Sequence, residues 1–294
     1  PNQTVVMMSV QGELEYIRRA MIAGASDYLT KPFTSDELVN SLRKVYEREV
    51  NRPKLTIVPT VPSPGLVVPT SDDRHGKVIA VFSPKGGIGR TTVAVNVALA
   101  IRQETRRSVA LADLSLTFGD VGVLLNLQGK TVTDLLPFIN DLEPQILDDI
   151  MVSHSSGLRV LLAPPRPEMA ELVTAEHINK IIVKLREMFD FVIVDTLPSF
   201  QDLMLAVLDS ADEIVVLATL EIHVLKNIRL FLETAEALGY TSKKITLVVN
   251  RANSGTGISI HDVEAHVNHK VAASIVSDWK LASFSHNRGV PFII

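Results

Sequence analysis

The sequence contains no cysteine in its 294 residues. Disulfides, thiol catalysis and cysteine-ligated metal sites are therefore excluded, and the absence fits a reducing cytoplasm. No uninterrupted apolar stretch reaches about 18 residues, so the sequence predicts no membrane-spanning helix. No basic segment followed by an apolar one opens the chain, so no signal peptide is expected. Because Pro1 lies inside a strand-like run, we expect the native protein to extend further upstream.

An excess of positive charge is also missing. Lys and Arg number 29 against 33 Asp and Glu, which gives a net charge of −4. This balance does not indicate a broad basic surface for nucleic acid, and no sequence-specific nucleic-acid contact is expected. The eight histidines are scattered along the chain. Even His261, His266 and His269 have no companion cluster, so we interpret them as surface or helix residues and not as a metal site.

Apolar residues, by contrast, make up 46% of the chain, which is enough for a large core. The pattern divides the sequence into three regions. Residues 1–50 predict strands at 4–9 and 27–29 and helices at 13–23 and 34–48. Residues 51–73 contain five prolines and predict a semi-extended linker, and residues 74–294 predict the main domain.

In the main domain, β-rich apolar runs alternate with helical patterns. Such alternation is typical of βαβ units and predicts an α/β fold with a doubly wound, mainly parallel sheet. Ligands of these sheets bind at the carboxyl ends of the strands. The predicted strands are 77–82, 108–112, 158–162, 190–194, 213–218, 244–249 and 271–276.

The glycine-rich segment 83–92 lies between the strand 77–82 and a predicted helix that contains residues 93–100. Its glycines let successive backbone N–H groups converge on one anion, and the N-terminus of the helix adds positive potential. The segment matches the P-loop pattern G-x-x-x-x-G-K-[ST] except at two positions, where Pro84 replaces the first glycine and Arg90 the lysine. It therefore predicts a nucleotide-binding loop of unusual composition.

Polar residues follow three of the predicted strands. Asp195 ends the run 191–194 in a Walker B pattern, in which a buried strand leads to an acid that holds a Mg²⁺-bound water. Asp113 follows the run 109–112 and is either a functional carboxylate or a cap of the next turn. Asn250 and Arg251 follow the run 245–249, where an Asn is also common without a ligand.

Residues 1–50 resemble the second half of a response-regulator receiver domain, which has a flavodoxin-like fold. The matching pieces are Ser9 at a strand end, Gly24-Ala25 before 27–29, and Lys31-Pro32-Phe33. In receivers, the Ser or Thr and the Lys contact a phosphorylated Asp, and the Lys-Pro bond is often cis. The phosphoacceptor of that family would lie upstream of Pro1, so both a docking or dimerisation module and a phospho-switch stay open.

The segment 83–92 resembles the deviant P-loop of the MinD/ParA family of ATPases, over about residues 76–291. A receiver-like region followed by a Ser-Pro-Lys-Gly-Gly loop is similar to the pilus-assembly branch called CpaE or TadZ. The resemblance implies ATP and Mg²⁺ as cofactors and a homodimer that sandwiches the nucleotide. It also implies partners in a pilus or secretion assembly, and a cytoplasmic protein recruited to the inner membrane or cell pole by peripheral association.

The resemblance also implies roles for individual residues. Lys85, the signature lysine, would reach the partner's nucleotide, Thr91 and Asp195 would hold Mg²⁺, and Asn250 would bind the adenine edge. The implied catalytic residues are Lys85, Asp113 and Asp195. The implied nucleotide-binding residues are Gly86, Gly87, Ile88, Gly89, Arg90, Thr91, Thr92, Asn250 and Arg251, with Asp278 and Trp279 near the base.

Three departures from the family pattern bear on hydrolysis. They are Pro84, Arg90, and Ser115 in place of the second acid of an Asp-x-Asp motif. A serine hydroxyl does not act as a carboxylate base at neutral pH. The expectation is therefore an ATP-binding, dimerising protein with slow hydrolysis. A non-hydrolysing scaffold and a DNA-partitioning ATPase of the ParA type stay open as alternatives.

Overall fold

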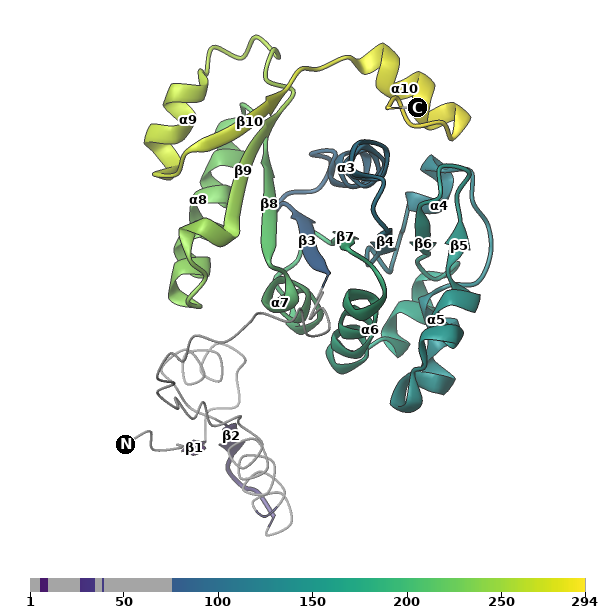
Figure 1. Ribbon diagram of the computed structural model, residues 1–294. Coiled ribbons are helices and arrows are strands. Elements are labelled where there is room, and N and C mark those ends of the chain that lie inside the picture. Colours follow the sequence, from purple (N-terminus) through teal and green to yellow (C-terminus); the bar gives the residue numbers. More distant parts are fainter. Residues whose placement is uncertain (1–5, 10–26, 35–38, 40–75, 294) are drawn as a thin grey trace, which may run out of the picture. The chain divides into compact units, whose positions relative to one another are not determined.

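The computed structural model describes residues 6–9, 27–34, 39 and 76–293 (Figure 1). The chain separates into two compact units, Pro1–Pro69 and Thr70–Ile294. In the part of the chain that the structure describes, no helix is long and apolar enough to cross a membrane.

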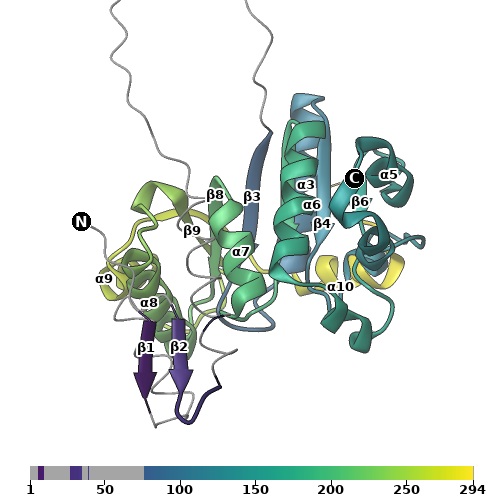
Figure 2. The same cartoon turned by 90° about the horizontal axis from the view of Figure 1, so that it is seen from below.

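In the first unit, strands β1 (Val6–Ser9) and β2 (Asp27–Thr30) pair in parallel. Figure 2 shows the two arrows side by side and pointing the same way. The peptide bond between Lys31 and Pro32 is cis. The strand predicted at 27–29 is confirmed, and the one predicted at 4–9 is confirmed over its described residues. The helices predicted at 13–23 and 34–48 and the linker 51–73 fall mainly or wholly outside the described residues, and the receiver-like domain stays a prediction.

The second unit is built on an eight-stranded sheet in the order β10-β9-β8-β3-β7-β4-β6-β5. Every pairing in it is parallel except that of β5 with β6. The strands are β3 (Lys77–Phe82), β4 (Val109–Asp113), β5 (Val152–Ser153), β6 (Arg159–Leu161), β7 (Phe191–Asp195), β8 (Glu213–Ala218), β9 (Ile245–Asn250) and β10 (Val271–Ile275).

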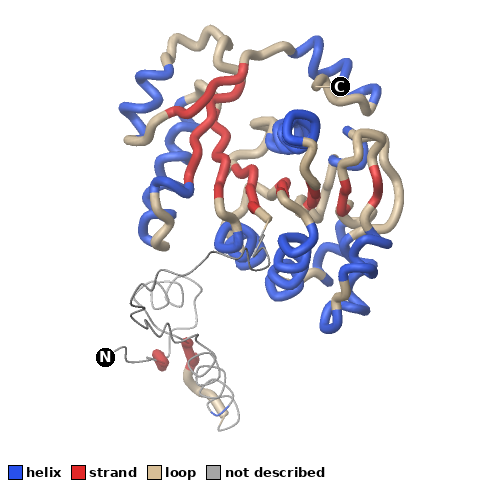
Figure 3. Tube along the Cα trace, in the orientation of Figure 1, coloured by secondary structure: helices blue, strands red, loops and turns tan. Residues whose placement is uncertain are grey.

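Helices cover both faces of this sheet, as expected for a doubly wound fold. Figure 1 shows α3 on one face and α6 and α7 on the other, and Figure 3 shows the strands as one row between the helices. The α-helices are α3 (Arg90–Thr105), α4 (Val121–Leu124), α5 (Pro144–Ile150), α6 (Ala175–Met188), α7 (Asp202–Ser210), α8 (Ile222–Ala237), α9 (Ile260–Val267) and α10 (Trp279–Arg288). Short 3₁₀ helices are η1 (Val132–Asp141), η2 (Pro167–Leu172) and η3 (Ser242–Lys244).

All seven strands predicted for this unit are present, with ends that differ by one residue or not at all. The exception to the parallel pattern is β5, which the sequence did not predict. It has only two residues, and it pairs with β6 at the edge of the sheet. A strand this short has no alternation to detect, so only its pairing defines it.

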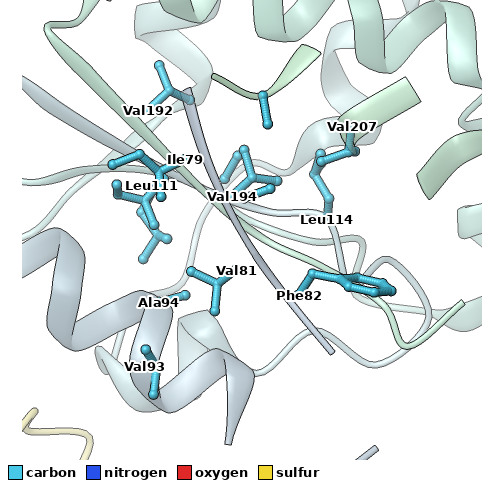
Figure 4. Packing of buried hydrophobic residues seen from close by; sticks show 14 of the residues in the cluster. Ile79, Val81, Phe82, Val93, Ala94, Leu111, Leu114, Val192, Val194 and Val207 are labelled. Atoms are coloured by element: carbon cyan, nitrogen blue, oxygen red, sulfur yellow. The ribbon is translucent and has the colours of Figure 1, made fainter. Parts of the chain in front are cut away.

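The core fixes the start of the glycine-rich segment. Strand β3 is buried from Val78 to Phe82, as expected for a central strand covered on both faces. The ring of Phe82 lies against those of Phe231 and Phe200, with centroids 4.9 and 6.3 Å away. Figure 4 shows this ring at the end of β3 and the side chains of Val93 and Ala94 on the neighbouring helix. The residues on either side of segment 83–92 are therefore held by apolar packing.

Candidate functional site

The carboxyl ends of three central strands meet at one point of the sheet. Asp195 at the end of β7 is in register with Asp113 of β4 on one side and with Val81 of β3 on the other. Segment 83–92 begins two residues after Val81. The parallel register therefore brings the glycine-rich segment together with Asp113, which follows it closely in the sequence, and with Asp195, about a hundred residues further along.

The backbone of segment 83–92 needs its glycines. Gly87 and Gly89 have φ angles of 77° and 95°, in the left-handed region that favours glycine. A Cβ on Gly89 would lie 2.7 Å from Nδ2 of Asn250, so a side chain there would displace the Asn250 amide. Gly89 is also the N-cap of α3, and no side chain caps that helix. The N–H groups of the first turn of α3 are therefore available to an anion.

Thr91 and Asp195 form the predicted metal-binding pair. The Thr91 hydroxyl donates to Oδ2 of Asp195 at 2.7 Å. The other oxygen of this carboxylate, Oδ1, is buried, and it has no hydrogen-bond partner among the described residues. Burial raises the pKa of the Asp195 carboxyl to about 6. A buried carboxylate oxygen without a partner beside a hydroxyl suits Mg²⁺ and its bound water, so the residues present fit this ion.

Arg90 folds back on the segment to which it belongs. Its Nη1 donates to the carbonyl of Ser83 at 3.0 Å, so the guanidinium closes the loop between its first residue and the start of α3. Burial lowers the pKa of Arg90, and the negative charge of Asp195 opposes that effect. An arginine has five N–H donors, so Arg90 can keep this bond and still bind a phosphate.

Lys85 lies at the exposed tip of the loop. Its ammonium group has no hydrogen-bond or ion-pair partner among the residues that the structure describes. A Cβ on the following Gly86 or Gly87 would have no atom within 4 Å, so the space around this tip is open. The charge of Lys85 is thus available to a ligand or to another molecule.

Asp113 is engaged by the turn that follows its strand. Its side-chain oxygens accept from the backbone N–H groups of Ser115 and Val121, both at 3.1 Å. Burial and the neighbouring charge of Asp195 raise the pKa of Asp113 well above its usual range. Gly119 packs directly on it, since a Cβ there would lie 2.5 Å from Oδ2. These contacts correspond to the turn-capping alternative that the sequence left open.

Asn250 and Arg251 hold the glycine-rich segment from the side of β9. Nδ2 of Asn250 donates to the carbonyl of Ile88 at 2.7 Å, and Nη2 of Arg251 donates to that of Gly87 at 3.1 Å. The side chain of Ile88 is buried in the core, so only its backbone faces this region. The structure thus places the predicted adenine-binding Asn250 in contact with the loop itself.

A pocket of about 760 Å³ extends from these residues along α3. Its lining includes Gly89, Thr92, Asn250, Asp278 and Trp279, so the structure brings the two residues predicted near the base to the same pocket as the loop.

The lining of this pocket also includes His286 on α10, whose Nε2 lies 3.0 Å from the Thr92 hydroxyl. Sequence reasoning treated the histidines as scattered and missed this contact. No local signal could reveal it, because the two residues are 194 positions apart.

The raised pKa of Asp195 makes the stability of the nucleotide-free protein depend on pH. The folded state holds this proton more tightly than the unfolded state, whose ordinary value is 3.8. The contribution of this proton to the free energy of unfolding is therefore complete below about pH 4, and it is lost as the pH rises to about 6. We expect Asp195→Asn to unfold with a higher free energy than the wild type at pH 7.5, by at most about 3 kcal/mol, and with little difference near pH 4.

Urea denaturation in the presence of a chelator measures this difference, and the exposed Asp141→Asn serves as the control. An Asp195→Asn protein that is equally or less stable than the wild type at pH 7.5 would contradict the expectation.

Known proteins share both the sequence pattern and the fold. The AAA domain family (AAA_31) matches residues 76–249. The MinD septum site-determining protein of Thermotoga maritima is 23% identical over 224 residues, which are 74% of this chain and 80% of the relative. Among solved structures, a ParA family ATPase from Chlorobium tepidum has a TM-score of 0.69 at 24% identity, covering 74% of this chain and 91% of that one. MinD from Pyrococcus horikoshii, complexed with Mg-ADP, has a TM-score of 0.64 at 21% identity, covering 74% and 87%. The chain belongs to the AAA domain family, and its main domain has the fold of the solved MinD and ParA structures.

Proposed function

We propose that this protein is an ATP- and Mg²⁺-binding molecular switch that dimerises around its nucleotide and positions a pilus or secretion assembly. The observation that carries the nucleotide part is the pair Thr91 and Asp195. A buried carboxylate oxygen without a partner is costly, and a Mg²⁺-bound water at this position would satisfy it. The uncapped N-terminus of α3 lies beside the pair and supplies N–H groups for phosphates.

In a nucleotide complex, each group of the site has one task. The backbone of 86–89 and the first turn of α3 bind the phosphate oxygens, and Arg90 adds a second positive charge beside them. Thr91 and Asp195 hold Mg²⁺, which neutralises charge on the phosphates when it is bound. The archaeal MinD with the same fold is complexed with Mg-ADP, which supports this choice of ligand.

Lys85 supports the dimer. Its charge lies at an open, exposed loop tip without an intramolecular partner among the described residues. A lysine in this situation favours a negatively charged group of a second molecule. In the family that the chain resembles, the corresponding lysine reaches the nucleotide of the partner subunit. Dimerisation would then depend on ATP.

Size-exclusion chromatography with light scattering tests this dependence. We expect Mg-ATP to convert the wild-type protein from monomer to dimer, and Lys85→Ala to remain monomeric because the charge that contacts the partner's phosphates is lost. Lys226→Ala, at an exposed position of α8, is the matched control and should behave as the wild type. The same mass with and without nucleotide in all three proteins would rule out the switch.

A second candidate function is a non-hydrolysing scaffold. Two observations favour it. Asp113 is committed to the turn that follows its strand, and Ser115 provides no carboxylate near it. Arg90 replaces the P-loop lysine, and its planar guanidinium is bonded to the loop carbonyl of Ser83, which fixes a different geometry beside the phosphates. These features favour occupancy of the site over rapid turnover.

Measurement of ATP turnover separates the two candidates. A slow ATPase should lose activity in Asp195→Ala by roughly a hundredfold, because the group that positions Mg²⁺ is removed. The Asp141→Ala protein controls for the loss of an exposed carboxylate elsewhere. Equal turnover in wild type and Asp195→Ala, with ATP still bound by the wild type, would establish the scaffold.

The role in an assembly rests on the order of elements in the sequence. A receiver-like region, a proline-rich linker and a Ser-Pro-Lys-Gly-Gly loop follow one another, as in the CpaE/TadZ branch. We expect a strain that carries Lys85→Ala to lose the focus of the protein at the membrane or pole, together with its surface pili. A strain with Lys226→Ala should keep both. Normal pili in the Lys85→Ala strain would show that the switch does not serve this assembly.

A further inference from the structure

Helix α10 and residues 289–293 cross over α3 as a strap. Figure 1 shows α10 leaving the end of β10, passing above α3 and ending beside α4. Asp278 caps its N-terminus by accepting from the N–H of Leu281 at 2.9 Å. Gly289, with φ 61°, packs so closely on α4 that a Cβ would lie 3.0 Å from the carbonyl of Val123. The strap therefore has a capped start and is held against α4 near its other end.

Between its ends, the strap has little packing of its own. Ser285 is the only residue of α10 that is buried, and Trp279 and Phe284 are 70% and 56% exposed. The pocket of about 760 Å³ lies beneath it, with apolar walls from Val93 and Val97 of α3 and from Leu281 of α10. A volume of this size lies within the range of ligand pockets, which is about 300–1,000 Å³. The helix is therefore a roof over a cavity and not a packed part of the core.

Two polar contacts join the strap to α3 and to the end of the glycine-rich segment. Nε2 of His286 lies 3.0 Å from the hydroxyl of Thr92. The side chain of Asn96 donates to the carbonyl of Thr92 at 2.8 Å and accepts from the N–H of Ile293 at 3.3 Å. Thr92 belongs to the first turn of α3, where the N–H groups that bind phosphate are located. The imidazole of His286 is therefore held at the edge of the phosphate site.

We propose that His286 is a phosphate-binding residue and that α10 is a strap that closes over the bound nucleotide through it. This inference rests on the proposed nucleotide function. An imidazole N–H is a good donor to a phosphate oxygen. The contact between Nε2 of His286 and the Thr92 hydroxyl already holds the ring beside the first turn of α3. The same ring lines the pocket on the side of Trp279 and Asn250 and a second pocket beside α4. His286 thus joins the phosphate end of the site to the roof of the cavity.

The two possible roles of His286, packing and phosphate binding, predict different losses of affinity across a series of ligands. Loss of a roof residue that only packs would weaken every ligand of the pocket, with or without phosphate. Loss of a donor to the first phosphate weakens ATP, ADP and AMP by the same factor and leaves adenosine unchanged. A hydrogen bond to a charged group corresponds to a factor of about ten to a hundred in affinity.

The experiment compares affinities of the full chain, in Mg²⁺, for ATP, ADP, AMP and adenosine. Calorimetry measures the tight ligands, and competition with a fluorescent ATP analogue measures the weak ones. His286→Ala removes the donor and His286→Gln keeps an N–H group. The control is His261→Ala, at an exposed position on α9. Thermal unfolding of each variant without nucleotide verifies that it is folded.

The single tryptophan of the chain, Trp279, provides an independent signal for the strap. It is the first residue of α10 and lines the pocket. Its emission should shift when Mg-ATP binds to the wild type. At saturating Mg-ATP the shift should be lost or reduced in His286→Ala and should return in His286→Gln.

We expect His286→Ala to lose affinity for ATP, ADP and AMP by a factor of about ten to a hundred, and His286→Gln to recover much of that affinity. Equal ATP affinity in wild type and His286→Ala would overturn this inference and leave the proposed function intact. An equal loss of affinity for adenosine would also overturn this inference and leave the proposed function intact. A wild-type protein that binds no Mg-ATP would overturn both.

Discussion

The site depends on one buried carboxylate at the end of a central strand. Asp195 has no exposed surface, and the register of β7 between β3 and β4 fixes its place. Burial of a charge without full pairing is costly, and its Oδ1 lacks a partner among the described residues. The surrounding sheet and helices provide the stability that maintains this arrangement. A site that is unfavourable when empty gains free energy from a cation and its nucleotide, and such a gain can drive a conformational or oligomeric change.

The residues around Asp195 separate binding from turnover. The backbone of the glycine-rich segment and the uncapped start of α3 need no particular side chain to hold a phosphate. Turnover needs more, because an attacking water has to be oriented and its proton accepted. Here the carboxylate of Asp113 is occupied by backbone N–H groups. The neighbouring position is Ser115. These features support the proposal of a protein that works through its nucleotide-bound state.

Residues from distant parts of the chain also contact the glycine-rich segment. Asn250 and Arg251 bind carbonyls of the glycine-rich segment from β9, and His286 binds Thr92 from α10. On the other side, Asp113 holds the turn that leads into α4, on which the end of α10 packs. A ring of contacts therefore runs from the loop through α10 and α4 and back to the carboxylate of β4. Such a closed ring is a physical route by which occupancy of the loop can bias the position of α10.

The sequence by itself determined the α/β class, the strands of the main domain, the glycine-rich segment between β3 and α3 and the acids at the strand ends. Strong local signals carry these features, since a buried central strand such as 77–82 is an apolar run and a phosphate cradle requires glycines. Tertiary structure alone decided what each polar group does. It closed Arg90 onto Ser83, committed Asp113 to a turn and set His286 against Thr92. The contact of His286 with Thr92 depends on helix packing, which brings together positions 194 residues apart, so no local pattern shows it. The contacts of Arg90 and Asp113 are local, but they depend on the exact backbone conformation of the loop and of the turn, which the residue types do not specify.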